Sequence, residues 1–368
     1  MRNYKIDVLR GICILLVLLH HFNIPYKLHD TFLGVQVFGE SLSTLLARNG
    51  NYGVTMFFVI SGFLITRHTL QRSGSLAQIR LKDFYIRRTA RIMPCLLLLA
   101  AMVTALGALG LKPFINQAPN GIEVPYGLTL AAAFTFWMNI LIIEYGWVNY
   151  ALGVLWSLSV EEVFYLAFPL LCVLLGRGKG FAALLLAVIC YAPYFRAMHS
   201  GAESGAYLYH YFSSFDGIAI GCLTALAAQK FQGAMPHPKL TAAAVSALMA
   251  ALYLYAPIKE VSTWGISAFA LLAAVLIFCF AQDAKTEANA ASAKALAWIG
   301  QRSYEMYLFH LIVLGLMKAA YFPKETLPAE KLMLLPLYFI AVFILSWAVE
   351  KYYSAPLNLK IRRKWLKP

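Results

Sequence analysis

The first segment with residues able to do chemistry is an apolar run that carries Arg10 near its start and His20 and His21 near its end. Arg10 and His21 are eleven residues apart, which on an α-helix gives ~16 Å of rise and only about 20° of rotation. His20 is turned by roughly 80° from Arg10. An imidazole titrates near neutral pH and suits general-base or covalent catalysis. The spacing therefore selects His21 over His20, although a snorkelling arginine and a histidine at the outer end of the span would give the same pattern.

A second candidate set lies at the start of a later apolar run, where Trp156 and Ser157 precede Glu161 and Glu162. Ionisable residues inside a membrane span are costly, so they are candidates for function. We predict that Glu161 lies at a depth similar to that of His21 and orients its imidazole, as a carboxylate does in a catalytic triad. Trp156, Ser157 and Glu162 are predicted to support it. The alternative is a wet vestibule in which both carboxylates make only structural hydrogen bonds.

An anion site is the third candidate. Arg88 and Arg91 are three residues apart and share a helix face at the cytoplasmic start of a span. With Arg10 they could hold phosphate groups, because the guanidinium fork matches phosphate oxygens. The alternative is that they are ordinary positive charges on the cytoplasmic side.

Three further ionisable residues occur in apolar runs. Asp7 precedes Arg10 by one helical turn, and His310 ends an aromatic helix. We predict supporting roles for both, although a lone histidine in an aromatic helix is more often a hydrogen-bonded core residue. Asp216 is predicted to be a structural partner of an unidentified donor.

The composition places these residues in a membrane protein. Of the 368 residues, 61% are hydrophobic and only 13% are charged, whereas a soluble domain usually has about a quarter charged residues. The net charge of +14 fits basic cytoplasmic loops and anionic lipid headgroups. The alternative is that these basic residues form the entrance to a binding site for a phosphorylated cofactor.

No nucleic-acid motif occurs, so we predict no nucleic-acid partner. The six cysteines form no CxxC pair, so we predict no metal site.

The apolar segments that must position these residues number eleven, each near the ~20 residues that a membrane span needs. The basic linker at 67–91 and the basic tail after residue 350 belong in the cytoplasm by the positive-inside rule. Both termini are then inside, which requires an even number of crossings. We therefore predict an all-α polytopic bundle of about ten transmembrane helices plus one re-entrant or partial segment at 128–144. The eleven segments lie near 8–24, 52–68, 92–111, 128–144, 155–175, 181–197, 207–228, 239–256, 262–281, 299–319 and 332–350.

Five motifs, in order along the chain, carry a resemblance to a known family. They are IDVLRG at 6–11 with His21 at R-x10-H spacing, GVTMFFVISGFLIT at 53–66, FYIRRTARIMP at 84–94, LWSLSVEE at 155–162 and SYEMYLFH at 303–310. Together they resemble membrane-bound acyltransferase family 3 over nearly the whole chain. The resemblance implies transfer of an acyl group, usually acetyl, from cytoplasmic acyl-CoA to a glycan hydroxyl. It also implies a bacterial inner membrane, and functional roles for His21, Arg10, Arg88 and Arg91.

The sequence departs from the family in two places. Many members have Y-x-x-E-x-P after the last span, whereas this chain has Ser354 in place of that glutamate, with Glu350 four residues earlier. Many members also carry an appended extracytoplasmic domain. We expect a single transmembrane domain over 1–368 without one.

The sequence therefore predicts an acyl-CoA-dependent O-acyltransferase. His21 is its catalytic base or acyl carrier, and Glu161 assists His21. A sugar or glycan is the acceptor, and membrane lipids surround the protein. A secondary transporter or flippase of a lipid-linked sugar is the alternative, since intramembrane His, Glu and Arg occur there too. A regulatory envelope protein is a third hypothesis. The outer loops offer few residues to recognise the acceptor, namely Tyr26, His29, Trp147, Asn149 and Tyr150.

Overall fold

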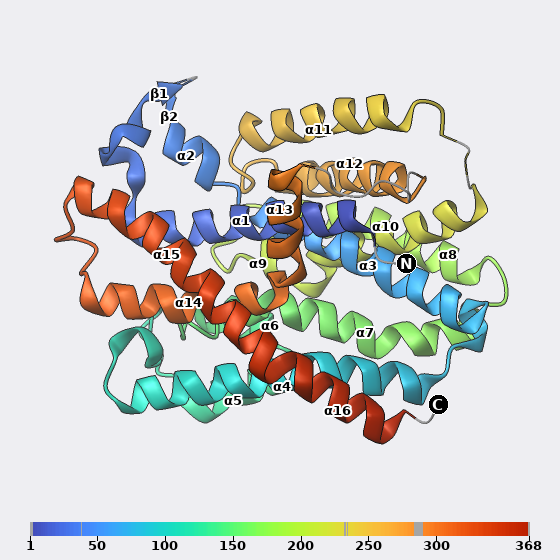
Figure 1. Cartoon of the computed structure of the whole chain (residues 1–368), viewed down its shortest axis with the longest axis horizontal. Helices are drawn as coiled ribbons and strands as arrows, with labels where there is room; N and C mark the ends of the chain where they lie inside the picture. Colours follow the sequence, from blue (N-terminus) through green and yellow to red (C-terminus); the bar gives the residue numbers. More distant parts are fainter. Residues whose placement is uncertain (1–2, 38, 232, 234, 283–289, 367–368) are drawn as a thin grey trace. The chain divides into compact units, whose positions relative to one another are not determined.

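The computed structural model describes residues 3–37, 39–231, 233, 235–282 and 290–366, and most of them are helical (Figure 1). They divide into two compact units, and each unit combines segments that are far apart in the sequence. The first unit comprises Met1–Cys13, Asn51–Phe84 and Val160–Gln301, and the second comprises Ile14–Gly50, Tyr85–Ser159 and Arg302–Pro368. Helix α1 (Tyr4–Tyr26) contributes its start to the first unit and its end to the second.

The first unit is built on the contact between α3 and α10, to which α8 and α12 are added, with α11 packed on α12. Helix α7 contributes most of its length to this unit, from residue 160 onward. Its elements are α3 (Asn51–Ser73), η3 (Leu76–Gln78), α7 (Leu155–Leu175), α8 (Gly180–Met198), α9 (Ala206–Tyr209), α10 (Tyr211–Lys230), α11 (Pro238–Tyr255), α12 (Ser262–Gln282) and α13 (Ala291–Gln301).

Helices α3 and α10 lie unusually close because a glycine on each faces the backbone of the other. A Cβ atom on Gly62 would lie 2.0 Å from the carbonyl oxygen of Ile218, and one on Gly221 would lie 2.1 Å from that of Val59. Only glycine permits such an approach between helices. The Gly62 of the motif at 53–66 is therefore a packing residue.

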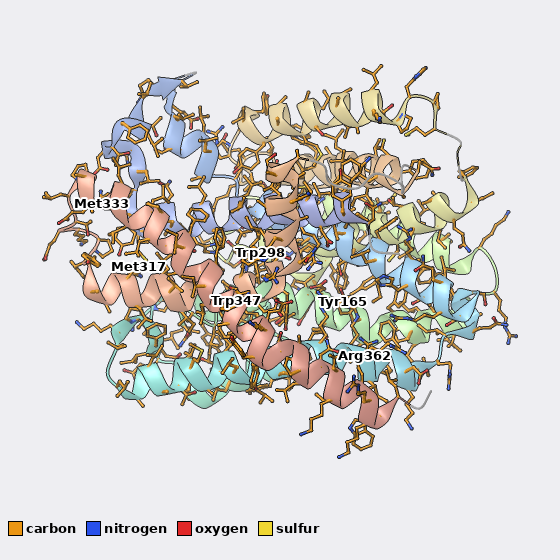
Figure 2. All side chains as sticks on the ribbon, viewed as in Figure 1. Tyr165, Trp298, Met317, Met333, Trp347 and Arg362 are labelled. Carbon is orange, nitrogen blue, oxygen red and sulfur yellow. The ribbon has the colours of Figure 1, made fainter. Side chains whose placement is uncertain are left out.

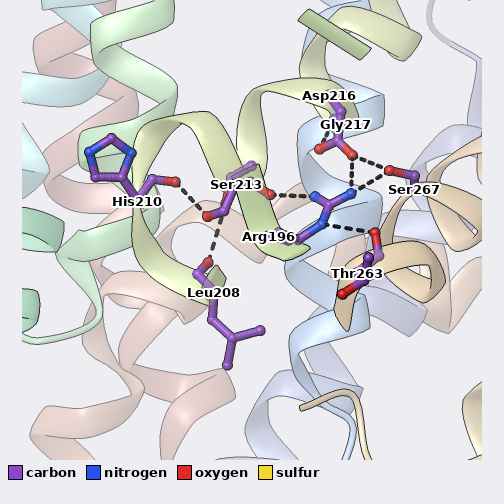
Figure 3. A network of polar contacts seen from close by, with 9 residues as sticks. Arg196, Leu208, His210, Ser213, Asp216, Gly217, Thr263 and Ser267 are labelled. Carbon is purple, nitrogen blue, oxygen red and sulfur yellow. Dashed lines mark hydrogen bonds and ion pairs between the residues drawn. The ribbon is translucent and has the colours of Figure 1, made fainter. Parts of the chain in front are cut away.

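Three helices of the first unit meet at a buried ion pair (Figure 3). Arg196 of α8 and Asp216 of α10 have side chains that are 0% exposed, and their Nη2 and Oδ2 atoms are 2.9 Å apart. Arg196 also donates to the carbonyl oxygen of Ser213 at 2.6 Å and to the hydroxyl of Ser267 on α12. The Ser267 hydroxyl donates in turn to Asp216 at 2.6 Å. Arg196 is thus the donor that the sequence left unidentified for Asp216.

The second unit holds the end of α1, most of α4, and the helices α14 and α15, which pack on each other. It also contains a two-stranded antiparallel ribbon in which Gln36 is paired with Ser41. Its elements are η1 (Leu28–Asp30), η2 (Phe32–Gly34), β1 (Gln36–Val37), β2 (Glu40–Ser41), α2 (Leu42–Ala47), α4 (Leu81–Ala108), η4 (Lys112–Phe114), α5 (Tyr126–Phe134), α6 (Met138–Tyr145), α14 (Ser303–Ala320), α15 (Pro328–Val349), the π-helical turn η5 (Glu350–Ser354) and α16 (Ala355–Trp365).

The prediction of an all-α polytopic membrane bundle is confirmed. Nine helical segments in the described part of the chain are long and apolar enough to cross a membrane. Helix α14 has 18 residues but is not one of the nine, and it carries Glu305, His310 and Lys318. It corresponds to the crossing predicted at 299–319, the ninth of the ten in chain order.

The segment predicted to be partial is broken into two short helices. Helices α5 and α6 have 9 and 8 residues, and Phe136 between them has a φ of 62°. Nine helical residues rise about 14 Å, less than half of the ~30 Å hydrocarbon core. Residues 128–144 therefore do not form one continuous spanning helix.

The C-terminal tail is helical beyond the predicted end of the last span at residue 350. After the π-helical turn η5, α16 continues to Trp365 and has Arg362, Arg363 and Lys364 in its last turn (Figure 2). Cations are favoured at this end of a helix, because the terminal carbonyl groups carry partial negative charge. The helix dipole is thus expected to stabilise α16 with these basic residues at its end.

Candidate active site

The arrangement of His21 is set by its own helix. Its Nδ1 lies 2.8 Å from the carbonyl oxygen of Val17, one turn earlier on α1. A carbonyl oxygen only accepts, so Nδ1 carries the proton and Nε2 of the neutral ring carries the lone pair. The side chain is half-buried. His21 therefore offers one free basic nitrogen from a fixed ring, which is what a general base requires.

His20 has a different environment. Its Nδ1 donates to the carbonyl oxygen of Ala47 in α2 at 2.6 Å, and a Cβ atom on Gly50 would lie 2.3 Å from the Cβ of His20. His20 therefore packs α1 against the segment that ends α2. This difference supports the selection of His21 over His20.

His310 of α14 is the nearest ring partner of His21 in the second unit. The two ring centroids are 4.8 Å apart, with an angle of 65° between the planes. The Nδ1 of His310 donates to the carbonyl oxygens of Tyr307 and Met306, at 2.7 and 3.1 Å. Its side chain is 0% exposed, and among the described residues its Nε2 has no hydrogen-bond partner. The two histidine rings are thus in contact, and each has its lone pair on Nε2.

Tyr307 links His310 to a predicted residue of α7. The Tyr307 hydroxyl donates to the carbonyl oxygen of Val154 at 2.9 Å and accepts from the hydroxyl of Ser157 at 2.6 Å. Its ring centroid is 5.9 Å from that of His310. The second unit therefore brings together three predicted site residues, His21, Ser157 and His310. Tyr307 was missed as a site residue, although its i, i+3 spacing to His310 gave a signal.

Glu161 has partners that the sequence did not suggest. Its Oε1 accepts hydrogen bonds from the hydroxyls of Ser61 on α3 and Tyr165 one turn further along α7, and these two hydroxyls also contact each other (Figure 2 labels Tyr165). All three residues belong to the first unit. Two hydroxyl donors fix the orientation of the carboxylate. The predicted action of Glu161 on His21 stays a prediction.

Two neighbours of Glu161 on α7 are buried. Trp156 is 7% exposed and Glu162 is 6% exposed. They are predicted to support the site, and that role also stays a prediction.

The predicted anion-binding residues fall in different units. Arg10 lies in the first unit, where its Nη1 is 3.8 Å from the carboxylate of Asp7. Arg88 and Arg91 lie on α4 in the second unit. The exposed Arg91 guanidinium is 5.8 Å from the ring centroid of Tyr304 on α14, and the Tyr304 hydroxyl donates to the carbonyl oxygen of Ile92 at 3.2 Å. The joint role of the three arginines stays a prediction.

The departure at Ser354 has a local structural explanation. The Ser354 hydroxyl donates to the carboxylate of Glu305 at 2.7 Å, and Glu350 pairs with Arg302 at 3.0 Å. Both contacts join the start of α14 to η5. Glu350 and Ser354 are the first and last residues of this π-helical turn, and both side chains face α14. Ser354 thus hydrogen-bonds a carboxylate of α14, and Glu350, four residues earlier, pairs with the residue that precedes α14.

The described residues contain no group of three or more side chains arranged to hold a metal ion. The predicted site residues carry imidazole, hydroxyl, carboxylate and guanidinium groups. Such a set is suited to acid–base chemistry and to the binding of anions.

Comparison with known proteins identifies the family. The model of a family described as "Acyltransferase domain" matches residues 3–351. A protein of Staphylococcus aureus strain COL named "Putative O-acetyltransferase" is 25% identical over 340 residues, which cover 86% of this chain and 51% of that protein. The peptidoglycan O-acetyltransferase OatA of Listeria monocytogenes is 23% identical over 334 residues, 85% of this chain and 49% of OatA.

The chain spans about half the length of these curated relatives. No solved structure matches it significantly. The family match extends over all five motifs and over both units, from the Arg10–His21 helix to the region of η5. The chain is therefore a polytopic membrane protein that belongs to acyltransferase family 3.

Proposed function

We propose that this protein transfers an acyl group, most simply acetyl, from cytoplasmic acyl-CoA to a hydroxyl of an extracytoplasmic or lipid-linked glycan. The relatives named O-acetyltransferases and peptidoglycan O-acetyltransferase support an acyl acceptor of this class. The single observation that carries the mechanism is the fixed ring of His21, whose Nδ1–H is bound to Val17 and whose Nε2 is basic. His310 adds a second basic nitrogen beside it.

The proposed chemistry begins with the acceptor hydroxyl. Its proton moves to Nε2 of His21 while its oxygen attacks the thioester carbonyl carbon. The C–S bond then breaks, and the CoA thiolate leaves and takes the proton from the imidazolium. In the alternative course Nε2 of His21 attacks the thioester carbonyl carbon, and the C–S bond breaks as the CoA thiolate leaves. The acceptor hydroxyl then attacks the acyl group on His21, which releases the imidazole, and the hydroxyl proton passes to the thiolate. Either course uses the same nitrogen.

The other proposed roles belong to the donor and to the orientation of His21. Arg10, Arg88 and Arg91 would hold the phosphate groups of CoA, because guanidinium groups bind phosphate oxygens with two parallel hydrogen bonds. Glu161 would orient or polarise His21, with its carboxylate held by Ser61 and Tyr165. We further propose that the protein lies in the bacterial inner membrane with both termini in the cytoplasm.

The test uses the full chain in proteoliposomes with radiolabelled acetyl-CoA inside and a peptidoglycan-derived glycan outside. We expect His21→Gln to reduce acyl transfer by about 10²–10⁴-fold, the usual contribution of a general base. The matched control is His237→Gln, which changes an exposed histidine just before α11 and should keep the wild-type rate. Transfer at the wild-type rate by His21→Gln would exclude this mechanism.

The same preparation distinguishes the rival hypotheses. A transporter or flippase of a lipid-linked sugar would move its cargo and leave acetyl-CoA intact. A regulatory protein would neither turn over acetyl-CoA nor move a sugar. Release of free CoA together with acylated glycan supports only the enzyme.

A further inference from the structure

Lys318 is a half-buried cation that pairs with none of the described carboxylates. It lies in the last turn of α14, and its Nζ is 3.8 Å from the ring centroid of Tyr150. The described carboxylates include none within ion-pair distance of it. By contrast, the buried Lys331 of the same unit is paired with Asp30. An ammonium group has three N–H donors, and an aromatic face attracts the charge without accepting the usual hydrogen bonds. The donors of Lys318 are therefore available to an anion.

Two further tyrosines, Tyr26 and Tyr338, lie near Tyr150. Burial, together with the nearby Tyr26 hydroxyl, raises the pKa of Tyr150 well above its ordinary value. Tyr150 is therefore neutral at physiological pH and can donate its proton. Tyr338 of α15 is 0% exposed, and within the described part of the chain its hydroxyl has no partner. The ring of Phe22 contacts both Tyr338 and Tyr26, with centroid distances of 5.5 and 5.0 Å.

The contacts between α1 and α14 connect this cluster to the histidine pair. His21 of α1 lies beside His310 of α14, and the Tyr26 hydroxyl donates to the carbonyl oxygen of Tyr321 just after α14 at 3.0 Å. Residue numbers rise along both helices between these two contacts. The helices therefore run side by side in the same direction, from the histidine pair toward Lys318. Lys318 is eight residues beyond His310, or ~12 Å along α14.

The geometry points to an anion subsite, formed by Lys318 and Tyr150, that binds a carboxylate of the glycan acceptor. The inference rests on the proposed function, because it takes the histidine pair as the place where the hydroxyl reacts. The separation of Lys318 from that pair would match the separation between the reactive hydroxyl and a carboxylate on the same sugar or on the next one. The subsite thus favours acidic over neutral glycans.

The test measures binding separately from catalysis. The full chain in nanodiscs of neutral lipid is titrated with methyl glycosides of N-acetylmuramic acid and N-acetylglucosamine, which differ by one lactyl carboxylate. We expect the wild type to bind the acidic sugar about tenfold or more tightly, as for hydrogen bonds to a charged group. Lys318→Met should remove this preference and leave the neutral sugar unaffected. Lys318→Arg should keep it, and Lys324→Met, at an exposed lysine, should behave as the wild type.

Two outcomes would overturn the subsite. Equal binding of the two sugars by the wild type is one, and an unchanged preference in Lys318→Met is the other. Failure of the proposed function gives a different result. In that case the preference for the acidic sugar is present in the binding titration, while acyl transfer is absent with both sugars. Transfer to both sugars at equal efficiency would retain the function and exclude the subsite.

Discussion

At the residue scale, the site depends on which nitrogen of each imidazole is occupied. His21 and His310 both use Nδ1 to bind carbonyl oxygens of their own helices. Two neutral rings in this state present only acceptors to each other, so they form no mutual hydrogen bond. When His21 takes a proton on Nε2, the lone pair of His310 becomes a suitable partner. Under the proposed function, His310 would thereby stabilise the protonated form of His21.

We therefore expect His310→Phe to reduce kcat by about 10–100-fold with little change in KM, because a hydrogen bond to a charged group is lost. Phenylalanine suits the buried position, so the thermal unfolding temperature should fall little. Steady-state kinetics with acetyl-CoA and thermal unfolding in detergent check the two parts. Tyr307→Phe is the comparison, since it keeps both basic nitrogens and should reduce kcat less. An unchanged kcat in His310→Phe would contradict the role of His310.

At the element scale, the close approach of α3 and α10 holds Ser61 where it binds Glu161. Ser61 precedes Gly62, which faces the carbonyl oxygen of Ile218. The motif at 53–66 therefore combines a residue that positions a carboxylate with a residue that allows helix packing. A change in the separation of α3 and α10 would displace both.

Gly62→Ala should lower the free energy of unfolding by about 1–3 kcal/mol, the usual cost of an added methyl group in a packed interior. The obstacle is backbone, at 2.0 Å from the new Cβ, so the helices must move apart. Thermal unfolding in detergent measures the effect. Gly178→Ala is the control, because a Cβ there meets no atom within 4 Å. Equal stability of the two variants would show that the close packing is not needed.

The buried ion pair also acts at the scale of elements, because it joins α8, α10 and α12. Arg196 makes hydrogen bonds to a carboxylate, a hydroxyl and backbone carbonyls, and Ser267 completes the coordination of Asp216 (Figure 3). Burial of two charges is costly, and such a pair persists when its hydrogen bonds are satisfied. Its main contribution is therefore to select one arrangement of the three helices.

Arg196→Met leaves Asp216 without its counter-charge and should lower the free energy of unfolding by about 3–5 kcal/mol. The double variant Arg196→Met with Asp216→Leu should recover much of this loss, because no charge is then left buried. Urea or thermal unfolding in mixed micelles gives both values. Arg177→Met, at an exposed arginine, serves as the control. A double variant less stable than Arg196→Met alone would refute the explanation.

At the scale of the whole molecule, the predicted topology depends on the broken segment α5–α6. Neither helix can cross the hydrocarbon core. If the segment does not cross, the basic residues between α7 and α8 lie in the cytoplasm, in agreement with the positive-inside rule. Irregular backbone at membrane depth is tolerated where protein buries it or where it lines a wet cavity. The broken segment is therefore a predicted lining of the site.

We expect a cysteine introduced at Gly178 of a cysteine-free variant to be protected from a membrane-impermeant maleimide added outside intact cells. A permeant maleimide should label it. A cysteine at His29 is the matched control and should react with both reagents, since that residue is exposed in the loop after α1. Labelling of position 178 by the impermeant reagent would show that the segment crosses.

The sequence alone determined the properties that depend on composition or on one helix. A chain with 61% hydrophobic and 13% charged residues cannot cover itself with polar groups in water, so its class follows directly. The common face of Arg10 and His21 follows from helical geometry because α1 is continuous. The break at 128–144 was also predictable, from the parity of the crossings together with the positive-inside rule.

The tertiary structure decided which distant side chains meet. The sequence placed His310 in an aromatic helix and assigned it a supporting role, but only the packing of α14 against α1 sets it beside His21. The same holds for the binding of Ser61 to Glu161 and of Arg196 to Asp216. The physical reason is that helical periodicity fixes the face on which a residue lies, whereas the partner of that face depends on how helices far apart in the sequence pack together.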